Sequence, residues 1–501
     1  MSIIGIDLGT TNSSLAQFDE MGNATIIHNS EGKNITPSVV WITDPKKKAI
    51  KVGDEAKNVV GSEENVYFEF KRDIGKPVRY PFFETDISPT DLSAFILQKL
   101  KSDYESSYGK IETAVITVPA NFANEQREAT LTAAKIAGLQ TKDLINEPTA
   151  AALYYTYTDK NLGNGLYMVF DLGGGTFDVS IVEVNGNDIE ILSSEGLQKC
   201  GGADFDNAII EIIKEKFLEI NKKELDIVSS NINIAVAENT KISLSNLKEK
   251  KITIIAEGFP KTEVTITRTE FEKKISTFIT QMKAVCENAI SDCNKTINDI
   301  SNVFLAGGSS RIPAIQDMLE KFHSKKPLTK GNPDEAISLG AAIYAGLKSD
   351  RSKKTETQAA RLKTVNLQEI APAFFGFAAV SSELREINSV IIKKNAPIPC
   401  SVTESFFTMH DNQTEVALTI TQSPVEETDP RFVRNIWEGT LTVPENRPAG
   451  QQIDVTFSYQ ENGVMQASFV DVASNKKQEV DITAQSEGSA ATIDIDEFLV
   501  E

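Results

Sequence analysis

The chain has 501 residues, of which 40% are hydrophobic and 24% are charged, and its formal net charge is -20. This length predicts two to four domains, and the acidic balance argues against nucleic acid or an anionic membrane as the main partner. The chain enters a strand without a signal-like segment and has no apolar run near about 18 residues. Because its four cysteines lack metal-ligand spacing, we expect a reduced, cytoplasmic protein.

Two copies of one glycine-rich pattern organise the first part of the chain. Residues 4–14 and residues 169–179 each read as an apolar strand that ends in Asp, then a Gly/Thr turn and a second strand. Glycine lets the backbone approach a ligand, turn amides bind anions, and the Asp can hold a cation that a phosphate shares. The repeat predicts two half-domains that face each other across a nucleotide polyphosphate. The alternative is a pair of ordinary hairpins.

The region between the two copies has the pattern of an α/β layer. We predict helices over 92–104 and 124–139, a buried strand over 113–119, a second short strand over 143–148, and a helix that begins at Thr149. Lys71 and Arg72 follow an apolar run and precede a glycine. Such a pair is usually a solvated loop charge, but beside an anionic ligand one cation can reach inward.

The second copy is followed by a similar order of elements. A strand over 302–306 and a glycine-rich turn lead into a helix over 312–322, and another helix begins after Asn332. Helices and a hairpin between about 205 and 295 form an inserted lobe. We therefore expect a duplicated α/β domain with inserted lobes over residues 1–348.

The composition changes after this domain. Residues 349–369 are polar without an apolar period, which is typical of an interdomain linker. Short alternating strands over 370–485 predict an antiparallel β-sandwich. Residues 486–501 are small, polar and acidic and are predicted to be a disordered tail.

The chain resembles the heat shock protein 70 chaperones, whose ATPase domain has the actin and sugar-kinase fold. The matching motifs lie in the family's order and are Ile6-Asp7-Leu8-Gly9-Thr10-Thr11-Asn12-Ser13, Lys71-Arg72, Val118-Pro119-Ala120, Asn146-Glu147-Pro148-Thr149, Phe170-Asp171-Leu172-Gly173-Gly174-Gly175-Thr176-Phe177-Asp178, Gly201-Gly202, Gly307-Gly308-Ser309 with Arg311, and Asn332-Pro333-Asp334. The resemblance implies an actin-like ATPase domain followed by a peptide-binding β-sandwich. It also implies an ATP-dependent chaperone in which hydrolysis controls the affinity for unfolded polypeptides.

The resemblance implies roles for single residues toward ATP or ADP and Mg²⁺. Asp7 and Asp171 would hold hydrated Mg²⁺ through water, and Thr176 would lie near the γ-phosphate. Lys71 and Glu147 would position the attacking water, and Asp178 would polarise it. Nucleotide contacts are implied for Gly9, Thr10, Thr11, Asn12, Gly173, Gly174, Gly175, Gly201, Gly202, Glu238, Lys241, Ser245, Gly307, Gly308, Ser309, Arg311 and Asp334.

In the sandwich, the resemblance assigns an extended apolar peptide to one hydrophobic pocket. The matching residues are Phe377, Val380, Phe407, Val416 and Leu418, which would equally suit an ordinary sandwich core. The tail residues Ile493, Ile495, Phe498 and Leu499 alternate with acids, so the tail could fill this pocket itself. Implied partners are unfolded polypeptides, a J-domain co-chaperone and a nucleotide exchange factor.

Three features depart from the family pattern. Ile242 stands where the resemblance predicts an arginine that stacks on adenine. The linker, residues 365–369, contains Asn366 and Gln368 where the family has a run of leucines, and the helical lid after the sandwich is absent. The chain thus resembles a short, lidless member. The alternative is a nucleotide-binding regulatory partner of chaperones with little ATPase or peptide-holding activity.

Overall fold

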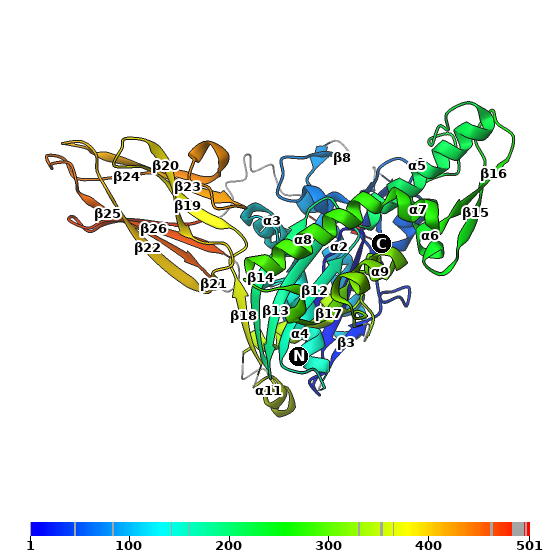
Figure 1. The fold of residues 1–501 in the computed structure, drawn as a ribbon, viewed down its shortest axis with the longest axis horizontal. Helices are drawn as coiled ribbons and strands as arrows, with labels where there is room; N and C mark the ends of the chain where they lie inside the picture. The colour runs from blue at the N-terminus through cyan, green and yellow to red at the C-terminus, as the bar shows by residue number, and fades with distance from the viewer. Residues whose placement is uncertain are drawn as a thin grey trace.

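The computed structural model describes residues 2–44, 47–82, 85–141, 143–159, 161–328, 331–350, 354–363, 365–460, 464–482, 495 and 498–500. A large α/β body carries the first part of the chain, and a strand-rich unit lies beside it (Figure 1). Among these residues, no helix is both long and apolar enough to cross a membrane.

The first half of the α/β body is built on a six-stranded sheet with the order β11-β10-β1-β2-β3, in which β4 also pairs with β2. Its first two strands form an antiparallel hairpin, and β10 runs parallel to β1. The strands are β1 (Ile3–Asp7), β2 (Asn12–Phe18), β3 (Ala24–Ile27), β4 (Thr36–Pro37), β10 (Thr113–Val118) and β11 (Asp143–Asn146). Helices α2 (Pro89–Tyr108) and α3 (Asn124–Ile136) pack on each other beside this sheet.

The second half repeats this arrangement. Strands β12 (Gly165–Leu172) and β13 (Phe177–Asn185) form the antiparallel hairpin, and β17 (Ile300–Ala306) runs parallel to β12. Strand β14 (Asp188–Leu197) continues the sheet beyond β13. The two glycine-rich patterns therefore occupy equivalent places, and the duplication predicted from the sequence is present.

Two helices hold the halves together. Helix α4 (Glu147–Thr158) contacts the second sheet, and α10 (Ala336–Lys348) contacts the first. One hydrophobic cluster joins buried residues from both sheets and both helices. Its members include Ile3, Ala151, Val169 and Ala342, which are all almost fully buried. This shared core fixes the two sheets relative to each other.

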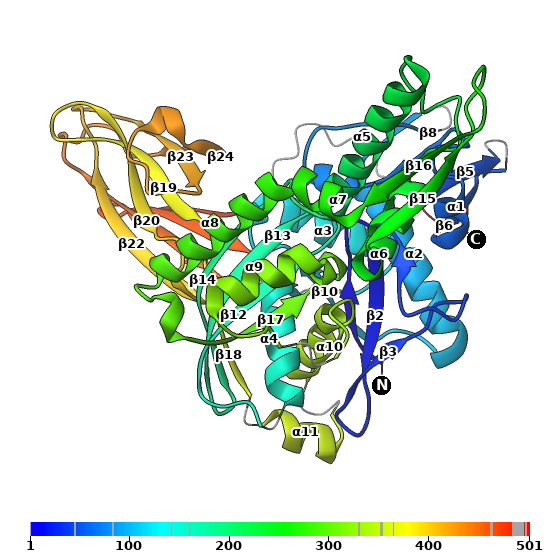
Figure 2. The same cartoon turned by 45° about the vertical axis from the view of Figure 1, so that its right-hand side comes forward.

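Smaller lobes rise from each half (Figure 2). One lobe consists of α5 (Gly202–Asn221), α6 (Ile234–Asn246), β15 (Glu249–Ile254), β16 (Thr262–Thr267) and α7 (Arg268–Lys274). The opposite lobe contains β5 (Val39–Asp44), β6 (Ala49–Val52), α1 (Asp54–Asn58), β7 (Val66–Phe68), the 3-10 helix η1 (Phe70–Asp73), β8 (Tyr80–Phe82) and β9 (Thr85–Ile87). Helix α8 (Ser276–Asp292) and helix α9 (Pro313–His323) complete the second half.

The strand-rich unit, which we call the β-domain, contains two four-stranded antiparallel sheets. They share one core, in which Phe375, Ile420 and Phe469 are almost fully buried. One sheet is formed by β19 (Phe374–Val380), β20 (Glu386–Ile392), β23 (Glu415–Ser423) and β24 (Arg434–Thr442). The other is formed by β22 (Cys400–Phe407), β25 (Gln452–Tyr459), β26 (Met465–Asp471) and β27 (Lys476–Asp481).

The predicted linker is more structured than its composition suggests. Helix α11 (Glu356–Leu362) buries Leu362 in the core between the two sheets, and Gln358 Nε2 donates to the Asp19 carbonyl at 2.9 Å. Strand β18 (Asn366–Ile370) then pairs parallel with β14 and antiparallel with β21 (Pro397–Ile398). Because the buried residues are isolated among polar ones, the sequence shows no apolar period there. The second sheet thus continues through the linker into the β-domain.

The prediction of a disordered tail is wrong for its described residues. Leu499 and Val500 form strand β28, which pairs with β6, and Ile495 is buried in the hydrophobic core that contains residues of β6 and α2. The tail residues Ile495 and Phe498 therefore lie on the α/β body and not in a pocket of the β-domain, while Ile493 lies outside the described residues. Isolated apolar residues of the tail, although they lie between acids, pack against apolar residues that are distant in the sequence.

The close contact between α10 and α4 generates a stability prediction. A Cβ atom added at Gly340 would overlap the Ala150 carbonyl oxygen. Gly→Ala in a helix interior normally stabilises by about 1 kcal/mol, but overpacking a rigid core costs about 1–3 kcal/mol. We expect Gly340→Ala to lower the free energy of unfolding measured in urea. Gly163→Ala is the control because open space surrounds Gly163, and equal effects of the two variants would contradict the packing argument.

Candidate functional site

A cleft of about 760 Å³ lies where the glycine-rich turns of the two halves meet. Nearly every residue that the sequence assigns to nucleotide or catalysis lines this cleft. These residues are Asp7, Gly9, Thr10, Thr11, Asn12, Lys71, Glu147, Asp171, Gly173, Gly174, Gly175, Thr176, Gly202, Glu238, Lys241, Ser245, Gly307, Gly308, Ser309, Arg311 and Asp334. The structure thus brings together residues that are more than 300 positions apart, as Asp7 and Asp334 show.

Two predicted residues lie just behind the cleft wall. Asp178 stands opposite Asp171 in the β12–β13 hairpin. Gly201 lies against the backbone of Gly174, where an added Cβ would come within 2.6 Å of the carbonyl oxygen. Asp178 and Gly201 therefore do not line the cleft themselves but lie next to Asp171 and Gly174, which do.

The two glycine-rich turns approach each other closely. A Cβ on Gly174 would collide with the Thr11 hydroxyl, and one on Gly175 would lie 2.6 Å from Thr10 Cγ2. Only glycine permits this approach of one backbone to the side chains of the other turn. The buried Thr11 Oγ1 has no hydrogen-bond partner among the described residues. A hydroxyl that faces the cleft without a protein partner suits a phosphate oxygen.

A group of buried carboxyl groups surrounds one buried ammonium group. Lys71, on η1, is only 4% exposed, and its Nζ lies 2.7 Å from Glu147 Oε1 at the start of α4. Thr117 Oγ1 donates to Asp7 Oδ1 at 3.0 Å, whereas Asp171 Oδ2 is buried without a partner among the described residues. The carboxyl groups therefore outnumber the cation that faces them.

This imbalance raises the pKa values of three aspartates. Burial, followed by the charge of Glu147, raises the pKa of Asp7 to about 7 and that of Asp178 to about 8, although Lys71 opposes both shifts. Burial, then Glu147 and Asp178, raises the pKa of Asp171 well above its usual range. Because a bound cation would favour the charged forms, the site is electrostatically prepared for one.

The donor set fits a hydrated Mg²⁺ ion that is shared with a nucleotide phosphate. Within the described residues, no three His, Cys, Asp or Glu side chains are grouped so that they could hold a metal ion together. Asp7 is the last residue of β1 and Asp171 is the next-to-last residue of β12, and Asp171 Oδ2 has no hydrogen-bond partner among the described residues. Mg²⁺ in proteins commonly keeps several waters and uses one or two carboxylates.

Arg72 has a different role from its neighbour Lys71. Its guanidinium group forms an ion pair with Asp204 at 2.6 Å and donates to the Gly175 carbonyl at 3.1 Å. Asp204 in turn accepts from the Gly201 amide at 2.9 Å. Neither residue of the pair is a solvated loop charge, because Lys71 faces the cleft and Arg72 joins η1 to the glycine turn and α5.

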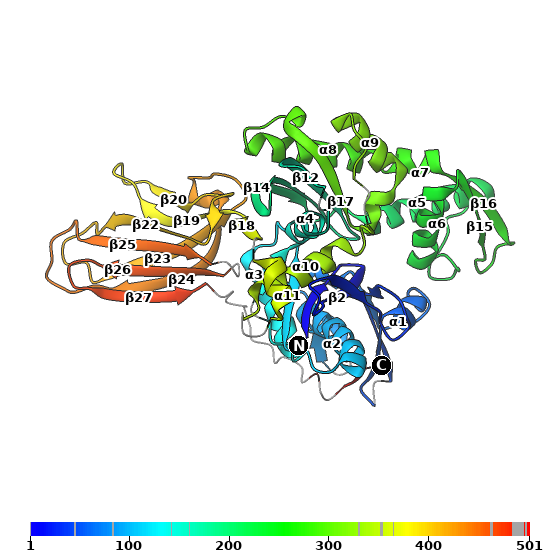
Figure 3. The ribbon, with the colours of Figure 1, turned by 90° about the horizontal axis from the view of Figure 1, so that it is seen from below.

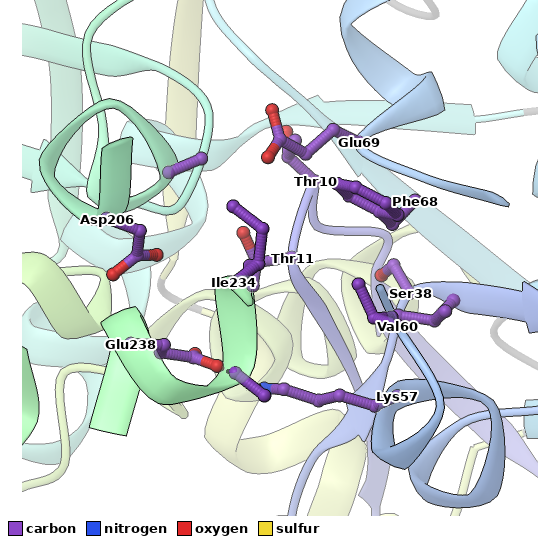
Figure 4. A pocket seen from close by; sticks show the side chains of 13 residues that line it. Thr10, Thr11, Ser38, Lys57, Val60, Phe68, Glu69, Asp206, Ile234 and Glu238 are labelled. Carbon is purple, nitrogen blue, oxygen red and sulfur yellow. Dashed lines mark ion pairs between the residues drawn. The ribbon is translucent and has the colours of Figure 1, made fainter. Parts of the chain in front are cut away.

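The wall formed by α6 carries charges that already have partners. Lys241 Nζ lies 2.8 Å from Asp206 Oδ1 and donates to the Gly202 carbonyl at 2.9 Å. Glu238 forms an ion pair across the cleft with Lys57 of α1 at 2.7 Å (Figure 4). Sequence reasoning missed Lys57 and Asp206, because no local spacing connects them to α6. Ile242 lines the same wall and is 55% exposed.

The opposite wall carries the predicted Arg311 and Asp334. Arg311 Nη2 lies 2.9 Å from Asp334 Oδ2, and both side chains are partly exposed. A Cβ on Gly308 would collide with Asp334 Oδ1, so this turn also requires glycine. Arg311 and Ile242 both line the cleft.

The five predicted peptide-binding residues differ in their burial. Phe377 and Leu418 belong to the β-domain core, and the Phe377 ring lies 4.8 Å from the Phe406 ring. Val416 is half-buried against the same core. Val380 and Phe407 are 42% and 59% exposed. The core assignment, which the sequence left open for Phe407 and Leu418, applies to Leu418 but not to Phe407.

The linker strand contacts the residue beside Glu147. Asn146 Nδ2 donates to Glu369 Oε2 at 3.1 Å, and Arg127 Nη2 donates to Asn146 Oδ1 at 2.7 Å. Burial raises the pKa of Glu369, and these neighbours oppose the shift. Glu369 of β18 is therefore linked to Glu147, the partner of Lys71, by its hydrogen bond to the preceding residue, Asn146.

A protein-family model that is described as Hsp70 protein matches the chain. It covers residues 3–89 and residues 77–498. Together these two segments span nearly the whole chain. They include both glycine-rich turns, the linker strand and the β-domain.

The raised pKa values predict how stability depends on pH. A carboxyl group whose pKa is higher in the folded protein stabilises it at low pH, and this contribution is lost as the pH rises through the folded value. The nucleotide-free protein should therefore lose stability as the pH rises from the ordinary Asp value of 3.8 to about 7 through Asp7, and to about 8 through Asp178. Asp178→Asn should remove from this loss up to about 1.4 kcal/mol per pH unit below about pH 8, and should change nothing above it.

Urea unfolding at several pH values without metal ions measures this difference. Asp226→Asn, at an exposed position, is the control and should leave the pH dependence unchanged. A steeper loss of stability with pH in Asp178→Asn than in the parent protein would show that the folded protein does not disfavour the charged form of Asp178.

Proposed function

This chain belongs to the heat shock protein 70 family, and from that premise we propose that it is an ATP-dependent molecular chaperone for unfolded polypeptides. Members of this family generally bind nucleotide and act as ATPases. The observation that supports hydrolysis by this chain is the buried Lys71–Glu147 pair at 2.7 Å, inside a cleft lined by both glycine-rich turns. A cation and three aspartates around a polyphosphate are the components that phosphoryl transfer requires.

The residues of the cleft have separate proposed roles toward the metal ion, the phosphates and the attacking water. Asp7 and Asp171 would hold Mg²⁺ through water, and the ion when bound would neutralise phosphate charge. The hydroxyl groups of Thr10 and Thr11 would contact phosphate oxygens, with Thr176 near the terminal phosphate. Glu147 fixes the Lys71 ammonium group, which would position the attacking water.

Asp178 would polarise that water from behind Asp171. Its pKa is raised to about 8 by burial and by Glu147, and a general base acts best when its pKa is near the working pH. Because Asp178 does not line the cleft, we assign it to the water and not to the nucleotide.

The β-domain is proposed to be a β-sandwich that binds an extended polypeptide through strand-like hydrogen bonds and apolar contacts. Val380 ends β19 and Phe407 ends β22, and both expose apolar side chains. Val416, near the start of β23, is half-buried beside the core. A J-domain co-chaperone and a nucleotide exchange factor complete the proposed set of partners.

One observation favours the second candidate function, a nucleotide-binding regulator with little ATPase or peptide-holding activity. Ile242 presents an exposed apolar side chain to the cleft where the family pattern has an arginine. Without a guanidinium group on that wall, adenine stacking rests on Arg311 alone among the residues we assign to it. Peptide stimulation of ATP hydrolysis distinguishes the two functions.

The role of Lys71 is tested by removing its charge. Lys71→Ala should lower the rate of ATP hydrolysis by about 10²–10³, since a preorganised electrostatic group is lost. ATP binding should change by less than about tenfold, or about 1.4 kcal/mol. Steady-state hydrolysis and nucleotide titration measure the two effects, with Lys76→Ala as the control at an exposed lysine. Hydrolysis by Lys71→Ala at the parental rate would exclude this assignment.

Coupling between the domains is tested at the linker strand. Val365 and Leu367 pack against the core between the two sheets, and Leu367 pairs with Ile189 of β14. Changing both to Asp should release β18, so that an unfolded peptide no longer stimulates ATP hydrolysis while the basal rate stays low. Asn366→Ser, at an exposed position of the same strand, should keep the stimulation.

ATP hydrolysis by the parent protein, measured with and without an unfolded peptide, distinguishes the two candidate functions. Stimulation by peptide supports the coupled chaperone. If the parent hydrolyses ATP equally with and without peptide, the regulatory function replaces it.

A further inference from the structure

The described tail residues lie against the lobe of the α/β body that contains β5, β6 and β7. Strand β28, Leu499 and Val500, lies parallel to β6, with Leu499 opposite Ala49 and Val500 opposite Ile50. It adds to the outer edge of a small sheet with the order β28-β6-β5-β7. Figure 3 shows the end of the chain beside α2, on the side of the molecule away from the β-domain.

Apolar side chains of the tail complete a hydrophobic core there. Ile495 is 5% exposed within the cluster that lines α2. The Phe498 ring lies 5.5 Å from Phe95 with the planes nearly perpendicular, and 5.4 Å from Phe82. Such aromatic contacts add to the free energy gained from buried area. We call the surface formed by Phe82, Phe95 and the outer edge of β6 the notch.

Charge complementarity accompanies the apolar contacts. The turn between β5 and β6 has three consecutive lysines in the sequence, residues 46–48, whereas residues 494–501 contain four acids. Lys48 Nζ lies 5.3 Å from the centre of the Phe498 ring. A cation at this distance is attracted by the face of an aromatic ring. The notch therefore presents a cation to an aromatic side chain, and the two segments have opposite charges in the sequence.

The geometry of the chain favours its own tail as the occupant. The last described residue of the β-domain, Ile482, accepts a hydrogen bond from Asn124 Nδ2 of α3 at 2.5 Å. Phe95, which receives the tail, lies on α2, and α2 packs against α3. The chain thus contacts α3 where it leaves the β-domain, and the tail contacts the neighbouring helix α2. A tethered segment so close has a high effective concentration at the notch.

We propose that the notch is a peptide-binding site of the ATPase lobe and that its occupant is the tail of the same chain. Binding uses strand addition at β6 for the backbone and the Ile495, Phe498 and Val500 side chains for selectivity. The ligand class is an extended acidic segment with the spacing Ile-x-x-Phe-x-Val. This site lies on the opposite domain from the proposed polypeptide site, and its existence does not depend on ATP hydrolysis.

A labelled peptide of residues 486–501 tests the proposal. Fluorescence anisotropy should show that the peptide binds a chain that ends at Gln485, and that it binds the full chain at least about tenfold more weakly because the tail occupies the notch. Phe498→Asp in the peptide should weaken binding by about tenfold or more. If the shortened chain does not fold, the full chain with Phe498→Asp should accept the parental peptide in its place.

Two lysine variants locate the bound peptide. Lys48→Glu in the shortened chain should weaken binding, whereas Lys283→Glu should not, although Lys283 also lies over an aromatic ring at 5.7 Å, that of Phe322. Equal binding by the full and shortened chains, or binding that Lys48→Glu leaves unchanged and an unfolded polypeptide displaces, would overturn the proposal. A full-chain dimer that Phe498→Asp converts to monomer would show that the tail binds a second copy instead.

Discussion

The structure depends on one unbalanced electrostatic group at its centre. Asp7, Asp171, Asp178 and Glu147 lie around the ammonium group of Lys71, and burial, followed by the surplus negative charge, raises the pKa values of the three aspartates. Such a site disfavours the ionised free protein and favours any state in which a further cation is bound. The hairpins, the close glycine turns and the core shared by α4 and α10 all serve to hold these carboxyl groups at one point. Nucleotide binding is thus linked to the free energy of the whole α/β body.

The same centre is connected to the β-domain by backbone. Strand β18 extends the second sheet, so the order of strands runs without a break from β17, beside the glycine turn, to β21 in the β-domain. Glu369 of β18 contacts Asn146, and the next residue is the partner of Lys71. A change in how the linker strand docks must therefore act on the start of α4. Because coupling free energies are reciprocal, a nucleotide that moves α4 must change the docking of β18 by the same amount.

The sequence predicted the parts of the site that are encoded locally. An Asp at a strand end, followed by Gly and Thr, specifies a turn that can approach a phosphate, and its repetition indicated the facing halves. It did not predict the Lys57–Glu238 pair, because two charges on short helices of different lobes have no spacing relation. It also missed α11 and the seated tail, where single residues such as Leu362 and Phe498 are buried within polar stretches. Their burial depends on surfaces distant in the chain, so composition alone suggested a linker and disorder.

The two attachments of the β-domain lie on different halves of the α/β body. The linker strand β18, which leads into the β-domain, pairs with β14 of the second half. The end of the β-domain contacts α3, and the tail that follows pairs with β6 of the first half. The nucleotide cleft lies between these halves. A rotation of one half against the other, which would open or close the cleft, must therefore change the distance between the attachments. If both attachments persist, the β-domain resists that rotation, and release of the tail lowers the resistance. If the proposed functions hold, a ligand at the cleft, at the linker strand or at the notch would bias the other two sites.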